Sequence, residues 1–172
     1  MLRYINAIAL SRTPIWQQHH LLRVFTWEEG KAVCILKTRK IPLPEPPGLY
    51  LMEADFSKEG LFLCRDYQLL SSFHQPHHLL MHQLCLPLLE YFPLAEPSPF
   101  VFGRYLSALR RSHDRDSAME NTLWFLASVL AKEGLLPPYQ EIKSLIRTRR
   151  CRNPKRVWRR IKEAMALVEG KG

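Results

Sequence analysis

The sequence lacks the features that mark membrane-spanning and secreted proteins. Its 172 residues contain no apolar run of about 18 residues or more, which excludes a helix that spans a bilayer. Arg3, Asn6 and Arg12 interrupt the apolar block that a secretory signal needs, so we expect a cytoplasmic protein. The four cysteines are widely and irregularly spaced. They form neither the CxxC pairs of a zinc site nor a dense disulfide framework.

The sequence also lacks the common motifs of catalysis. It contains no GxSxG, no P-loop and no GxGxxG. Four histidines cluster at positions 74, 77, 78 and 82. His78 and His82 would share one helical face, as zinc-binding pairs do, but no carboxylate or cysteine joins them at ligand spacing. We interpret the cluster as the polar start of a surface helix, and we expect no enzyme, no metal and no other cofactor.

Acidic residues are absent from residues 142–162, and this absence is the strongest functional signal. The segment contains ten lysines and arginines, and the rest of the chain holds 15 basic residues against all 16 acidic ones. Almost all of the net charge of +9 therefore comes from one short segment. Charge concentrated in this way creates a strong local potential, and nucleic acid is the commonest polyanion that meets it. The alternative is a solvated face of a terminal helix.

The apolar residues within this basic segment predict two amphipathic helices, over residues 139–150 and 154–168. Asn153 and Pro154 form an N-cap followed by proline at the first helical position. The second helix has one apolar stripe, which consists of Val157, Ile161, Ala164, Met165 and Val168. The stripe would dock on the protein and leave the cations outside to neutralise phosphates. The predicted contacts are Arg147, Arg149, Arg150, Arg152, Lys155, Arg156, Arg159 and Arg160.

The hydrophobic pattern predicts an α+β fold in two parts. Residues 1–73 alternate with period two, which is typical of strands, and residues 74–172 change to the helical period of 3.6. The predicted strands are 4–13, 21–27, 32–37, 49–56 and 61–67. The predicted helices before the basic segment are 77–90, with Pro87 kinking or ending it, 100–111, and 118–133, capped by Asp116 and Ser117. We predict a five-stranded OB-fold-like β-barrel followed by an all-helical domain.

The barrel offers a second, smaller set of candidate contacts. Lys37, Arg39 and Lys40 cluster at the end of the third strand and in the loop after it, and Trp16 lies in a nearby loop. Exposed aromatics beside cations on a barrel are typical of single-strand binding, because bases stack on the rings and the backbone follows the charge. We expect Trp16 to be exposed and Phe25 to fill the barrel interior.

The sequence resembles the RecO family of bacterial recombination mediators. Residues 7–14 (AIALSRTP) are similar to the AIxLxRxP strand that opens that family, and residues 21–31 (LLRVFTWEEGK) to its second strand, which ends in LFTxExGK. Lys37 matches the lysine that closes the third strand. The helical half has a similar layout, with PFVF at 99–102 and GLLP at 134–137. Many members carry a four-cysteine zinc module after GLLP, whereas this chain has only Cys151 there, so zinc is not carried over.

The resemblance implies a DNA-binding accessory protein of recombinational repair. It implies binding of single- and double-stranded DNA, strand annealing, and recombinase loading in the bacterial cytoplasm, at the nucleoid. RecR and single-strand-binding protein are the partners it implies, and no membrane is involved. Two alternatives stay open from the residues themselves: an adaptor whose basic helices bind an acidic peptide, and an RNA-binding factor.

Overall fold

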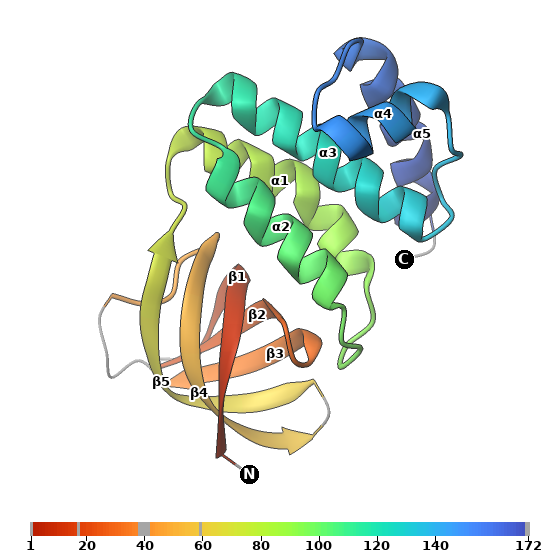
Figure 1. The fold of residues 1–172 in the computed structure, drawn as a ribbon. Helices are drawn as coiled ribbons and strands as arrows, with labels where there is room; N and C mark the ends of the chain where they lie inside the picture. Colours follow the sequence, from red (N-terminus) through yellow and green to blue (C-terminus); the bar gives the residue numbers. More distant parts are fainter. Residues whose placement is uncertain (1, 17, 38–41, 59, 171–172) are drawn as a thin grey trace.

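The computed structural model describes residues 2–16, 18–37, 42–58 and 60–170, and it confirms the predicted α+β fold (Figure 1). Five strands come first: β1 (Leu2–Trp16), β2 (His19–Thr26), β3 (Gly30–Lys37), β4 (Gly48–Lys58) and β5 (Leu61–Ser72). The helices follow: α1 (Pro76–Tyr91), α2 (Pro99–Arg111), α3 (Arg115–Lys132), α4 (Gln140–Thr148) and α5 (Pro154–Glu169). None of the described helices is both long and apolar enough to cross a membrane.

The five strands form a closed, OB-fold-like barrel in the order β1-β2-β3-β5-β4. β3 and β5 pair in parallel, and the other neighbouring strands pair antiparallel. The interior follows from strict alternation. Along β3, Ala32, Cys34 and Leu36 are buried, whereas Val33 and Ile35 between them are only half-buried.

One face of the barrel and the helices share a hydrophobic core, which is separate from the core inside the barrel. Ile8, Leu10, Phe25 and Leu49 point out of the barrel and belong to the same buried cluster as the helices. Phe25 packs edge-on against Phe92, with ring centroids 6.0 Å apart. The prediction that Phe25 fills the barrel interior is therefore wrong. Because Val24 belongs to the core inside the barrel and successive side chains of a strand point to opposite faces, Phe25 points outward, to the helices.

A glycine turn fixes the second contact between the two parts. Gly30, the first residue of β3, has φ of 69°, and a Cβ there would collide with the carbonyl oxygen of Glu96. Next to Glu96, in the loop between α1 and α2, the Ala95 amide donates to the Lys31 carbonyl over 2.9 Å. The loop between α1 and α2 thus lies directly on the barrel, which holds the helical part in a fixed position.

α3 is the central helix, and it is buried on almost every side. Asp114 caps it: its carboxylate accepts from the Ser117 amide over 2.7 Å, and the Ser117 hydroxyl accepts from the Asp114 amide. The prediction that Asp116 and Ser117 form the cap is wrong by two residues, because Ser117 acts at the third helical position of a capping box. Gly134, with φ of 72°, follows the end of the helix as predicted.

His78 and His82 are buried, so the prediction that they begin a surface helix is wrong. They lie on the face of α1 that packs inward, and α1 continues through Pro87. His82 Nε2 lies 2.8 Å from the Leu10 carbonyl of β1, and Nδ1 lies 2.6 Å from the Tyr105 hydroxyl of α2. The carbonyl can only accept, so Nε2 carries the proton and the Tyr105 hydroxyl donates to Nδ1. A neutral His82 therefore connects the barrel to two helices.

The first prediction concerns the stability of this histidine contact. Burial lowers the pKa of His82 below its ordinary 6.5, and it lowers the pKa of His78 as well. The unfolded chain therefore takes up protons first as pH falls, and the free energy of unfolding should fall as pH drops below about 6.5. His82→Phe should flatten part of this dependence. His82→Phe should also lower the free energy of unfolding at neutral pH, because the Leu10 carbonyl and the Tyr105 hydroxyl lose their partner. The expected loss is about 1–3 kcal/mol for each buried group left unpaired.

Urea denaturation between pH 5 and 8 measures both effects. The control is His113→Gln, which removes an exposed histidine outside the contact with Leu10 and Tyr105 and should not reproduce the effect of His82→Phe. An unchanged pH profile in His82→Phe would contradict the assignment of a neutral, buried His82.

Candidate nucleic-acid interface

The basic segment is displayed by α4, α5 and the loop 149–153 between them. Ile142 and Leu145 of α4 are buried, and the apolar stripe predicted for α5 is its buried face. The predicted cap is also confirmed: Asn153 accepts from the Arg156 amide over 3.2 Å, and Pro154 begins the helix. Because both helices bury their apolar sides, most of the cations face outward.

Trp124 of α3 anchors this segment to the core. Its indole N–H donates to the Ile146 carbonyl of α4 over 3.1 Å. The Arg149 guanidinium lies 3.5 Å from the centroid of the indole ring, and its Nη2 donates to the Ser107 hydroxyl over 3.1 Å. Arg149 also ends α4, with φ of 59° in the left-handed region. Arg149 therefore fixes the loop and is held against the protein.

Glu141 holds two further arginines of the predicted set. Its carboxylate lies 2.9 Å from Arg160 Nε and 3.1 Å from Arg156 Nε. Its own backbone N–H, together with these arginines, lowers the pKa of Glu141, so the carboxylate is ionised at neutral pH. The Arg160 guanidinium also lies 3.4 Å from the ring centroid of Tyr139. Arg156 and Arg160 therefore share one negative charge and tie α5 to α4.

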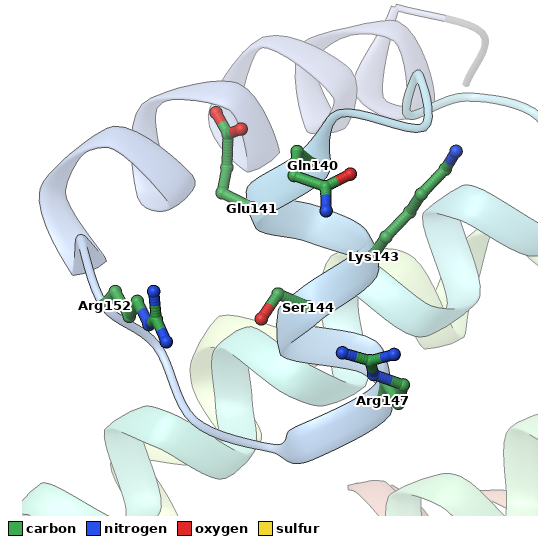
Figure 2. Close-up of a pocket in the computed structure, with 6 residues that line it drawn as sticks. All are labelled: Gln140, Glu141, Lys143, Ser144, Arg147 and Arg152. Carbon is green, nitrogen blue, oxygen red and sulfur yellow. The ribbon is translucent and has the colours of Figure 1, made fainter.

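The remaining predicted cations are exposed. Within the described part of the chain, no carboxylate pairs with any of them. They are Arg147, Arg150, Arg152, Lys155 and Arg159. Lys143, which the sequence reasoning did not select, is exposed beside them. A hollow of about 570 Å³ lies at this surface, lined by Gln140, Glu141, Lys143, Ser144, Arg147 and Arg152 (Figure 2).

The basic surface continues onto α2, which the sequence reasoning missed. The Arg104 guanidinium lies 4.6 Å from the Trp124 ring centroid. Burial, and then the nearby charges of Arg111 and Arg104, lower the pKa of Arg149. Arg104 and Arg111 are seven residues apart, which places them on one side of α2 after two turns. That spacing is the signal that could have identified them.

The barrel candidates lie apart from this surface. Lys37 ends β3 and is paired in register with His19, which pairs in turn with Trp16. Trp16 is 74% exposed, as expected, and contacts His19 edge-on, but it is the last residue of β1 and does not lie in a loop as predicted. α4 and α5 pack on α3, on the side of the helical part away from the barrel (Figure 1). Arg39 and Lys40 lie outside the described residues.

Among the residues that the structure describes, no three His, Cys, Asp or Glu side chains come together as metal ligands. The arrangement can neutralise an anion by charge and hydrogen bonding. No protein-family model matches the chain, and neither does any curated protein sequence. The resemblance to RecO therefore remains a hypothesis based on short motifs.

The second prediction separates the arginine that fixes the loop from one that is exposed in it. Arg149→Ala removes a desolvated cation–π contact and a hydrogen bond, and should lower the free energy of unfolding by about 1–2 kcal/mol. Arg150→Ala should change it by less than about 0.5 kcal/mol, as for an exposed surface residue. Urea denaturation of the two variants measures the difference. Equal effects would show that Arg149 does not anchor the loop.

Proposed function

We propose that this protein binds DNA as an accessory factor of recombinational repair, with the exposed cations of α4, α5 and their connecting loop as its main contact. One observation carries the proposal. Six lysines and arginines of α4, α5 and the loop between them are exposed, and no carboxylate in the described residues pairs with them. They are Lys143, Arg147, Arg150, Arg152, Lys155 and Arg159.

The chemistry of this surface fits phosphates better than bases. Arginine forms paired hydrogen bonds with phosphate oxygens, and lysine adds a mobile point charge. Contacts of this kind fix the position of a strand without reading its sequence. We therefore propose sequence-independent binding of the sugar–phosphate backbone, driven largely by the release of counterions.

The barrel supplies the second part of the proposal. Trp16 is exposed beside His19 and Lys37, and this combination suits a base stacked next to a neutralised phosphate. Barrels of this kind bind oligonucleotides on the surface around their second and third strands. We propose that Trp16 and Lys37 contact single-stranded DNA.

The assignment to recombination depends on the resemblance to RecO. The AIALSRTP motif falls on β1, and the LLRVFT part of the second motif forms most of β2 of an OB-fold-like barrel. This placement supports the resemblance, and from the resemblance we propose strand annealing and recombinase loading, with RecR and single-strand-binding protein as partners.

A groove beside α5 favours the adaptor as a second candidate. It has a volume of about 350 Å³ and an apolar wall formed by Leu84, Pro87, Leu126, Trp158 and Met165. Lys162 and Glu169 line the same groove, together with Gln83. The apolar wall and Lys162 would suit an acidic peptide with an apolar side chain, whereas Glu169 would repel its acidic groups. A peptide bound in this groove would leave the exposed cations of α4 and of the loop 149–153 without a role, so we prefer DNA as the ligand.

The third prediction tests the main surface by salt titration. The wild type should bind a fluorescent single strand, with a log–log salt slope that corresponds to several phosphates. Replacing Arg150, Arg152, Lys155 and Arg159 together by glutamine should lower the slope by about 0.7 for each lost contact. Fluorescence anisotropy between 50 and 200 mM salt measures it, with an RNA strand of the same sequence in parallel.

Lysines on the two parts of the molecule give a matched control. Lys155→Gln should weaken binding, and Lys58→Gln at the end of β4 should not, although both remove one exposed charge. Wild-type affinity in the fourfold variant would refute the α4–α5 surface. If the strand fails to bind while an acidic peptide binds, the adaptor takes its place.

The fourth prediction concerns Trp16. Trp16→Ala should weaken single-strand binding by about tenfold or more, because one stacked base contributes about 1–3 kcal/mol. Duplex binding should change little, since paired bases are not available to the ring. Anisotropy with both DNAs measures the two affinities. An equal loss on duplex and single strand would show that Trp16 is not a stacking site.

A further inference from the structure

We infer that the hollow beside α4 binds a phosphomonoester, the group found at the end of a DNA strand. This inference depends on the proposed function for its biological ligand, but the chemistry of the hollow stands by itself. The surrounding helical surface would contact internal phosphodiesters, and the hollow would hold a strand end.

The first reason is that the cations reach the hollow from two sides. Gln140, Lys143, Ser144 and Arg147 are spaced three or four residues apart, so they form one face of α4. Arg152 belongs to the connecting loop and closes the opposite side (Figure 2). Lys155 and Arg159, in contrast, lie on the exposed side of a single helix. A compact anion in the hollow can therefore contact cations on both of its sides at once. Along an extended backbone, each phosphate would contact a single cation.

The second reason is the charge of the hollow. Glu141 is the one acidic residue that lines it, and its carboxylate is engaged by Arg156 and Arg160 of α5. Figure 2 shows this side chain directed toward α5, away from Arg147 and Arg152. Three cations thus remain uncompensated. A phosphomonoester carries a charge of about −1.5 to −2 at neutral pH and three acceptor oxygens, whereas a phosphodiester carries −1.

The third reason is the supply of hydrogen-bond donors. The guanidinium groups of Arg147 and Arg152 can each donate two parallel hydrogen bonds to phosphate oxygens. Lys143 also lines the hollow, and Figure 2 shows its side chain directed away from Arg147 and Arg152, so its ammonium group would have to turn to reach the same anion. The Ser144 hydroxyl and the Gln140 amide add uncharged donors. The volume of about 570 Å³ lies within the ordinary range for small-ligand sites and admits the sugar that follows the phosphate.

The fourth reason is that the loop carrying Arg152 is held at both ends. Arg149 stacks on Trp124 before it, and Asn153 caps α5 after it. A cation on a fixed loop loses less conformational freedom when it binds, which favours a defined site over a diffuse charged surface.

The test compares three single strands of one base sequence at the same salt concentration. One has a 5′-phosphate, one has a 5′-hydroxyl, and one has a 5′-hydroxyl with one extra nucleotide, so that a phosphodiester supplies the added charge. The wild type should bind the 5′-phosphorylated strand about tenfold more tightly than both others. Arg147→Gln with Arg152→Gln should bring the ratio to about one, and Lys143→Gln should reduce it in part.

The matched control is Arg159→Gln, which should weaken all three strands equally and keep the ratio. Equal binding of the three strands by the wild type would overturn the inference while leaving the proposed function intact. If no strand binds but a nucleoside monophosphate binds in an Arg152-dependent way, the phosphomonoester site stands and the proposed DNA function fails.

Discussion

The indole ring of Trp124 is the contact on which the basic surface depends. It lies on the most deeply buried helix, donates a hydrogen bond to the Ile146 carbonyl of α4, and carries the Arg149 guanidinium on its face. Without it, the segment 142–162 would keep its charge but lose its geometry, because α4 has only nine residues and is too short to be stable alone. The core of the protein thus determines where the charge is displayed.

Nine of the ten cations of the segment divide into two groups with different roles, and the tenth, Lys162, lines the groove beside α5. Arg149 is held on Trp124, and Arg156 and Arg160 share the carboxylate of Glu141. These arginines shape the surface, and they contribute little to neutralising an anion that binds from outside. The exposed group surrounds the hollow and the loop, where no described carboxylate competes for it. Net charge therefore overstates the number of phosphate contacts, and contact geometry gives a smaller and more specific set.

Much of the fold could be predicted from the sequence, because periodicity reports which side chains share a face. The strands, the helices and the buried stripe of α5 followed from it. Periodicity does not tell which face points inward, so Phe25 was placed in the barrel although it packs on Phe92. The burial of His82 depends on Leu10, which is 72 residues away. In the candidate site, the charge was visible in the sequence. The pairing with Glu141 across the loop was not, because it requires the packing of α5 on α4.

NMR of the ¹⁵N-labelled chain during titration with a short single strand locates the DNA on the protein. Binding to α4 and α5 should shift the backbone signals of residues 143–159 and the side-chain Nε–H signals of Arg147, Arg150, Arg152 and Arg159. Smaller shifts are expected for Arg149 and Arg160, which are engaged within the protein. Shifts confined to the barrel, or to the groove between α1 and α5, would contradict the assignment of DNA binding to α4 and α5.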